Sequence, residues 1–126
     1  MKIAILGYGT IGSGVAEVLR INQAQIEKKL GEPVDLKYVL DLRTDIGVDN
    51  DKLISDFSVI ENDPEVKLVV ETMGGIHPAY EFVKACLEKG KHCVTSNKAL
   101  VDAVGSKLIS IAREHHCNFY FEASVG

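Results

Sequence analysis

Short apolar runs alternate along this chain with longer stretches in which apolar residues recur every three or four positions. The short runs have the length and composition of strands that are buried on both faces of a sheet. They predict strands at Lys2–Leu6, Val34–Leu40, Val66–Glu71, Lys91–Ser96 and Cys117–Glu122.

The stretches between these runs predict helices. Apolar residues from Ile11 to Leu30 follow the period of one amphipathic helix. A second helix begins at His77-Pro78, where a proline in the first turn costs no hydrogen bond, and a third spans Lys98–His115. Residues 42–65 are less regular and rich in acids, and we expect a loop there that contains a short helix or strand.

This alternation of strand and helix is typical of a parallel sheet with helices on both faces. We therefore expect an α/β fold, a doubly wound parallel sheet that forms one domain over residues 1–126. The sequence stops at residues 123–126, directly after the last predicted strand. A domain rarely ends where its next element should begin, so we expect a truncated domain from the N-terminal part of a longer protein.

Composition and charge exclude several classes of partner. Hydrophobic residues make up 46% of the chain and charged residues 25%, as in globular domains. The 14 Lys and Arg against 18 Asp and Glu give a net charge of −4, which argues against binding to nucleic acid. Apolar runs such as Ile3–Leu6 are far shorter than the roughly 20 residues of a membrane helix.

The cysteines indicate a reducing compartment. Cys86, Cys93 and Cys117 are odd in number and lack the spacing of a metal or redox motif. We expect them to be small buried apolar side chains in a cytoplasmic protein, and we expect no zinc site.

The strongest candidate for chemistry is the loop Gly7-Tyr8-Gly9-Thr10-Ile11-Gly12. A GxGxxG string alone is weak evidence, but this one follows a predicted strand and opens a predicted helix, which is the context of a dinucleotide-binding loop. In that context Gly7 permits the tight turn, Gly9 lets a pyrophosphate approach the backbone, and Gly12 lets the helix pack closely on the strand. The alternative is a glycine turn that binds nothing.

The end of the second predicted strand should contact the adenosine ribose. An acid there favours NAD through the 2′-hydroxyl, whereas a nearby arginine accommodates the 2′-phosphate of NADP. The chain offers both, as Asp41 and Arg43, and either residue alternatively is a solvated loop charge. The preference between the two cofactors stays open at this stage.

Ligands of open α/β sheets bind beyond the carboxyl ends of the strands. Besides the glycine loop, residues 72–75, 95–98 and 122–124 lie at that edge of the predicted sheet. Lys98 places an amine there, where it can pair with a carboxylate or polarise a carbonyl group. The alternative for a single lysine is an ordinary surface charge.

Four motifs together resemble one family. GYGTIGSGV at 7–15, ETMGG at 71–75, TSNKAL at 95–100 and FEASVG at 121–126 occur in the order and spacing of the nucleotide-binding portion of homoserine dehydrogenase. The resemblance extends from Met1 to Gly126. It implies a Rossmann-type NAD(P)-binding domain of an enzyme that interconverts L-homoserine and L-aspartate 4-semialdehyde on the route to threonine and methionine.

The resemblance also implies roles for single residues. Thr10 and Ile11 would contact the pyrophosphate directly, and Thr72 and Ser96 would lie along the nicotinamide half. Lys98 would lie near the nicotinamide and the substrate. Backbone oxygens of Glu122 and Val125 match positions that help to bind a sodium ion in some members of the family.

Part of the family's machinery lies beyond Gly126. The proton-donating lysine, its aspartate partner, the contacts to the substrate carboxylate and the segment through which members dimerise all follow this region. We therefore expect the chain to bind cofactor without turnover, and the parent protein to be a homodimer or homotetramer. Many members also carry a basic residue directly after the second strand, whereas Leu42 separates Asp41 from Arg43 here, so a preference for NADP is not assumed.

Three other interpretations remain. Aspartate-semialdehyde dehydrogenase and dihydrodipicolinate reductase share the plan of the domain but do not explain TSNKAL together with FEASVG. A regulatory module that senses NAD without catalysis, as in potassium channels, has no need of a lysine at the fourth strand's edge. The third alternative is an α/β domain whose glycine loop is empty.

Overall fold

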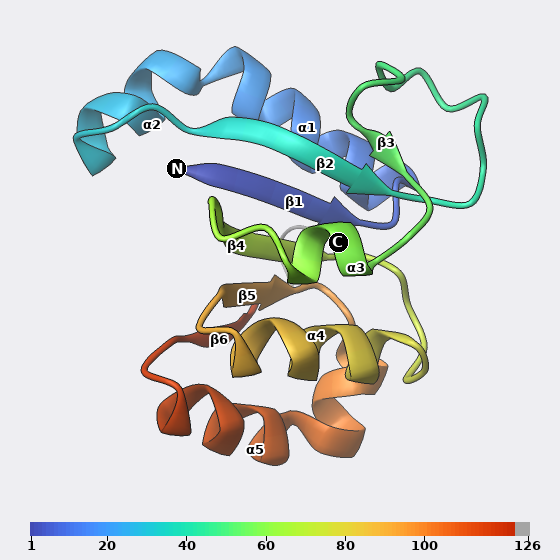
Figure 1. Cartoon of the computed structure of the whole chain (residues 1–126), viewed down its shortest axis with the longest axis vertical. Coiled ribbons are helices and arrows are strands. Elements are labelled where there is room, and N and C mark those ends of the chain that lie inside the picture. Colours follow the sequence, from blue (N-terminus) through green and yellow to red (C-terminus); the bar gives the residue numbers. More distant parts are fainter. Residues whose placement is uncertain (123–126) are drawn as a thin grey trace.

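A computed structural model describes residues 1–122 of the chain and shows a single twisted parallel sheet (Figure 1). Its six strands lie in the order β3-β2-β1-β4-β5-β6, with every neighbouring pair parallel. The strands are β1 (Lys2–Leu6), β2 (Asp35–Leu40), β3 (Leu53–Ile54), β4 (Val66–Glu71), β5 (His92–Thr95) and β6 (Phe119–Phe121). The predicted doubly wound α/β fold is confirmed, because the strand order reverses direction on either side of β1.

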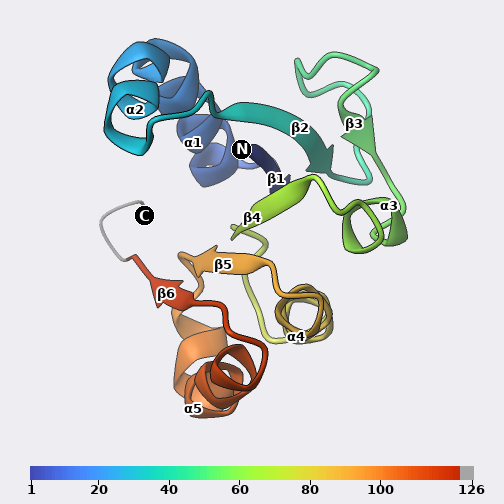
Figure 2. The ribbon, with the colours of Figure 1, turned by 60° about the vertical axis from the view of Figure 1, so that its left-hand side comes forward.

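Helices cover both faces of this sheet. Figure 2 shows α1 and α2 on one side and α3 and α4 on the other. Leu100 and Leu108 of α5 belong to the same buried core as Val83 and Leu87 of α4, which places α5 on the α4 side. The helices are α1 (Thr10–Ile21), α2 (Gln23–Leu30), α3 (Ser58–Glu61), α4 (Ala79–Glu88) and α5 (Lys98–Glu114).

The central strand explains the apolar runs of the sequence. Residues Ile3 to Leu6 of β1 are between 0% and 3% exposed, because β2 and β4 flank the strand and helices cover both of its faces. Such a strand has no solvated face, so its sequence is a continuous apolar run.

The structure corrects the prediction of one long helix over residues 11–30. Asn22 has φ −103° and ψ 17°, which are not helical values, and it ends α1 and begins α2. Its backbone N–H donates to Val18 O and its carbonyl accepts from Ile26 N, so both helices stay bonded through it. The apolar period continues across the break, and therefore periodicity alone did not reveal it.

The irregular acidic segment contains both a strand and a helix, and the strand adds a sixth to the five that were predicted. β3 has only two residues, which pair with Val39 and Leu40 of β2. It is too short to show an alternating pattern. In α3, Ile60 is fully buried in the core and fixes that turn against the sheet.

The three cysteines are buried and free of disulfides, as predicted. Cys86 and Cys93 have no exposed surface, and Cys117 is 7% exposed. Burial raises the pKa of the Cys117 thiol. Over residues 1–122, no helix combines the length and the apolar character needed to cross a membrane.

A cluster of ion pairs and hydrogen bonds lies at the amino-terminal edge of the sheet. Asp63 accepts hydrogen bonds from Lys37 Nζ at 2.5 Å and from the Tyr38 hydroxyl at 2.7 Å. Next to it, the buried Lys91 donates to the backbone oxygens of Asp63 and Val66. The Lys37 ammonium lowers the pKa of Asp63 to about 2.

We expect Asp63→Asn to remove part of the chain's stability at neutral pH, about 1–2 kcal/mol for lost charge-assisted hydrogen bonds. A carboxylate whose pKa is lowered on folding stabilises the fold above its unfolded pKa, and this contribution disappears as the pH falls from about 4 to about 2. Urea unfolding across this pH range should therefore show a smaller loss of stability in the variant. The exposed Asp45→Asn is the control, and an equal pH dependence in all three proteins would contradict the prediction.

Candidate functional site

The glycine loop joins the carboxyl end of β1 to α1 and lies against the end of β4. Gly7 has φ +87°, a left-handed conformation that favours glycine. Its N–H donates to Leu40 O at 2.8 Å, which holds the turn beside β2. A Cβ at Gly7 would also lie 3.2 Å from Met73 Cγ, so the residues after β4 pack closely against the loop.

Two further glycines of the loop differ sharply in their surroundings. A Cβ at Gly12 would lie 2.3 Å from Gly7 O and 3.0 Å from Thr72 Oγ1, so only glycine allows α1 to approach the strand this closely. A Cβ at Gly9 would meet nothing within 4 Å. The backbone at Gly9 is therefore open to a ligand, as the predicted approach of a pyrophosphate requires.

The first turn of α1 presents its amide groups toward this open side. Ser13 N donates to Gly9 O in the first bond of the helix, so the N–H groups of Thr10, Ile11 and Gly12 have no acceptor within the helix. The cap residue, Gly9, has no side chain to satisfy them, and the first turn carries no acid. This end of α1 suits an anion such as a phosphate.

Asp41 and Arg43 meet at the end of β2. The Asp41 carboxylate accepts from Tyr8 N at 3.0 Å, which ties it to the glycine loop. It also accepts from Arg43 Nε at 3.0 Å and from an Arg43 terminal nitrogen at 2.8 Å. The Arg43 guanidinium holds the pKa of this carboxylate well below its usual range, and the pair faces the solvent mainly through Arg43.

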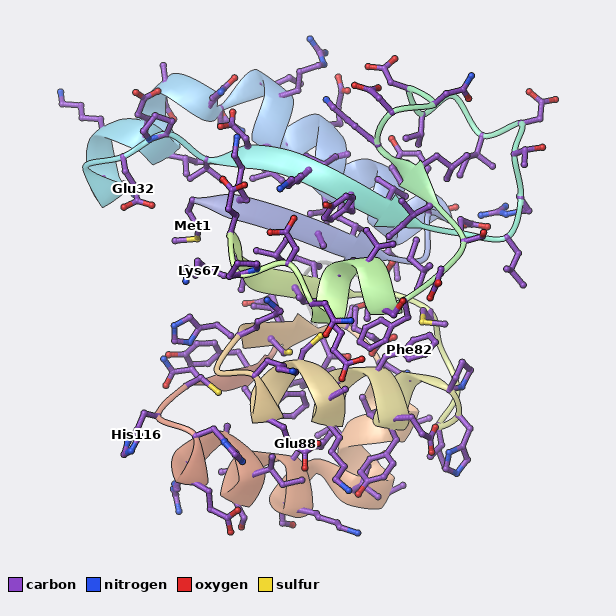
Figure 3. All side chains as sticks on the ribbon, viewed as in Figure 1. Met1, Glu32, Lys67, Phe82, Glu88 and His116 are labelled. Carbon is purple, nitrogen blue, oxygen red and sulfur yellow. The ribbon has the colours of Figure 1, made fainter. Side chains whose placement is uncertain are left out.

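These elements surround a cavity of about 430 Å³. Polar groups of the glycine loop, Asp41, Arg43 and Thr72 line one part of it. Its apolar part was not predicted from the sequence, and comes from Leu40, Leu42, Met73, Pro78 and Phe82. Phe82, labelled in Figure 3, lies on α4 and stacks on Phe57 with ring centroids 4.2 Å apart.

Thr72 has a structural contact in addition to its predicted place beside the cofactor. Its hydroxyl lies 2.8 Å from Gly7 O and 3.1 Å from Leu6 O, both acceptors in the glycine loop or directly before it. The side chain therefore links the end of β4 to the loop after β1.

The second part of the predicted edge lies after β5. Ser96 N donates to Glu71 O at 3.2 Å and so stays beside the end of β4. Lys98 begins α5, has a side chain 76% exposed and pairs with Asp102 at 2.9 Å. Neither Ser96 nor Lys98 lines the cavity beside the glycine loop.

Three polar residues of the ETMGG and TSNKAL motifs are buried at this edge, which their sequence positions alone did not predict. Glu71, Thr95 and Asn97 are 0%, 0% and 6% exposed and are hydrogen-bonded to one another. Their positions at the ends of two neighbouring strands were visible in the sequence, but their contact depends on the pairing of β4 with β5.

Comparison with known proteins identifies the family. The family described as homoserine dehydrogenase, NAD binding domain, matches residues 7–122. The chain belongs to this family. Among solved structures, the homoserine dehydrogenase of Thiobacillus denitrificans superposes with a TM-score of 0.92 at 31% identity, over 98% of this chain and 30% of that one.

Curated homoserine dehydrogenases agree with this assignment. The enzyme of Bacillus subtilis is 33% identical over 99% of this chain, and that of Synechocystis is 34% identical over 100% of this chain. The chain spans only 30% of each of those two proteins. The predicted resemblance to homoserine dehydrogenase is thus confirmed for the NAD-binding domain and favoured over the alternative families.

The predicted sodium site lies only partly within the described residues and stays a prediction. Glu122 lies at the end of the described residues, where its N–H donates to Thr95 O at 2.9 Å. Val125 lies outside them. Within residues 1–122, no group of three or more His, Cys, Asp or Glu side chains is placed to hold a metal ion.

Proposed function

We propose that this chain binds NAD(P)H as the cofactor-binding part of an enzyme that interconverts L-homoserine and L-aspartate 4-semialdehyde. The observation that carries the proposal is the glycine loop, with a backbone open at Gly9 and a helix packed at Gly12 too closely for any other residue. Membership of the homoserine dehydrogenase NAD-binding family supports the reaction.

The chain's own residues suggest how the cofactor would lie. The pyrophosphate fits the amides of Thr10, Ile11 and Gly12, where the helix dipole adds to the attraction. The adenosine would extend over the end of β2, with its ribose at Asp41 and Arg43 and its base against the apolar part of the cavity.

The nicotinamide half would extend the other way, over the ends of β4 and β5. The strand order reverses between β2 and β4, and dinucleotides bind across such a reversal. Thr72 and Ser96 lie along this path, and Lys98 follows them at the start of α5. When bound, the nicotinamide supplies the hydride acceptor or donor, and Lys98 would contribute a positive charge near the substrate.

We expect the chain to bind reduced dinucleotide but not to oxidise homoserine, because hydride transfer also needs a positioned proton donor, which the resemblance places beyond Gly126. Calorimetric titration with NADH and with NADPH tests the first part. An absorbance assay for homoserine-dependent reduction of NAD or NADP tests the second. Absence of binding in a folded sample, or clear turnover, would each contradict the corresponding part.

Three finer proposals concern the parent protein. We propose that it acts in the cytoplasm, supported by three buried cysteines with free thiols. Assembly as a homodimer or homotetramer is proposed from the family resemblance alone. A structural sodium ion at the backbone of Glu122 and Val125 has the same basis.

A further inference from the structure

A carboxylate is buried at the end of a central strand, on the nicotinamide side of the proposed site. Glu71 is the last residue of β4 and has no exposed surface. It accepts hydrogen bonds from Met73 N at 2.7 Å, from the Thr95 hydroxyl at 2.6 Å and from Asn97 Nδ2 at 3.4 Å. The carboxylate therefore holds the loop after β4 and the loop after β5 at the same time.

The direction of each hydrogen bond in this cluster is determined by its partners. Asn97 N donates to the Thr95 hydroxyl at 2.9 Å, so that hydroxyl directs its own hydrogen to Glu71. Asn97 Nδ2 also donates to Gly75 O at 2.5 Å, which ties the far end of the 72–75 loop to the loop after β5. Replacing any one partner leaves a buried group unsatisfied, which is costly.

Asn97 also determines how α5 begins. Its Oδ1 accepts from Leu100 N at 3.1 Å, and so caps the first turn, which carries Lys98. Within α5, Val104 has φ −140° and ψ 16°, and this kink separates the first turns from the rest of the helix. The Lys98 turn is therefore held at its start by the Asn97 cap and is separated by the kink from the longer helical segment.

We propose that Glu71, Thr95 and Asn97 are positioning residues that join the 72–75 and 95–98 loops into one rigid support for the nicotinamide half of the cofactor and orient Lys98. This inference rests on the proposed function. A core position with no such task is filled at lower cost by an apolar residue, because burying a carboxylate is unfavourable unless it is fully hydrogen-bonded.

The test compares ligands that differ in the nicotinamide half. NADH is paired with ADP-ribose, and NADPH with ADP-ribose 2′-phosphate, in calorimetric titrations of the 126-residue chain. Glu71→Gln keeps the shape of the side chain but turns one acceptor oxygen into a donor that faces other donors. We expect it to weaken binding of the reduced dinucleotides about tenfold and to leave the ADP-ribose ligands within about twofold of wild type.

A matched pair of variants separates positioning from simple loss of stability. Thr95→Ser keeps the hydroxyl and should bind like wild type, whereas Thr95→Val removes it and should behave like Glu71→Gln. Asn97→Ser retains a capping oxygen for α5 but lacks the amide that reaches Gly75 and Glu71, and should also lose affinity for the reduced dinucleotides. If Glu71→Gln fails to fold, the comparison of Thr95→Ser with Thr95→Val tests the positioning role in its place.

Each possible outcome has a definite meaning. A loss that is equal for the dinucleotides and the ADP-ribose ligands, together with a lower melting temperature, would assign these residues a purely structural role and overturn the inference. Unchanged dinucleotide binding in folded Glu71→Gln and Thr95→Val would also overturn it. A wild-type chain that is folded and binds none of the four ligands would instead refute the proposed function, and the inference with it.

Discussion

Replacing Gly12 with alanine is expected to abolish dinucleotide binding, with a loss of affinity of at least about a hundredfold, or about 2.7 kcal/mol. The added Cβ would lie 2.3 Å from Gly7 O, a distance that no carbon and oxygen tolerate. That oxygen belongs to the backbone of the glycine loop and accepts from the Thr72 hydroxyl. The loop or the start of α1 must therefore move, and both would contact the pyrophosphate.

The same clash lowers the stability of the chain. Overpacking in a closely packed region typically costs about 1–3 kcal/mol, and the strain at Gly12 falls on backbone that no change of rotamer can relieve. Calorimetric titration with the reduced dinucleotides measures the loss of binding. Urea unfolding of the same sample measures the stability and shows that the variant is folded during the titration.

Gly14→Ala is the matched control, because it makes the same chemical change two residues later in α1. A Cβ at Gly14 would meet nothing within 4 Å, and the position is exposed. Alanine in a helix interior is more favourable than glycine by about 0.5–1 kcal/mol, so this variant should be more stable and bind normally. Binding by Gly12→Ala within a few-fold of wild type would show that the cofactor does not depend on this loop.

The larger elements of the fold could be predicted because their environment is uniform. Strand β1 lies inside the sheet with both faces covered, and its apolar run reports burial directly. β3 could not be predicted, since a two-residue strand exists only through its pairing with Val39 and Leu40. The break at Asn22 was equally hidden, because the apolar face continues through it.

The candidate site divides in the same way. The glycine loop, Asp41, Arg43 and Thr72 could be predicted because the carboxyl ends of parallel strands gather at one edge. Phe82 could not, because it reaches the cavity from the second turn of α4 and depends on how that helix crosses the sheet. Glu71 resembled an ordinary polar residue at the end of a strand, and only the pairing of β4 with β5 brings it to Thr95.

Replacing Arg43 and replacing Asp41 are expected to change the preference between NADH and NADPH in opposite directions. Arg43 donates to the Asp41 carboxylate from two of its nitrogens. We expect the guanidinium to turn from Asp41 toward the 2′-phosphate when NADPH binds, and we expect NADH to use the Asp41 oxygens for its ribose hydroxyls. NADPH would therefore depend on Arg43 and NADH on Asp41.

We expect Arg43→Ala to weaken NADPH binding about thirtyfold, through loss of a charge-assisted contact to phosphate, and to preserve or improve NADH binding. Asp41→Asn keeps an oxygen for Tyr8 N but removes the negative charge that repels a phosphate. It should strengthen NADPH binding and weaken NADH binding, by about tenfold in their ratio. Parallel calorimetric titrations of both variants with both cofactors measure the two changes.

Arg20→Ala is the control for net charge, because it removes the same charge from an exposed side chain of α1 that pairs with Glu17. Its effect on either cofactor should be small, since salt screens exposed charges beyond about 8 Å at physiological ionic strength. If Arg43→Ala weakened NADH and NADPH equally, the guanidinium would serve only to fix Asp41. If Asp41→Asn left NADH binding unchanged, the ribose would be held by another group. The role of Asp41 would then be to hold the glycine loop through Tyr8 N.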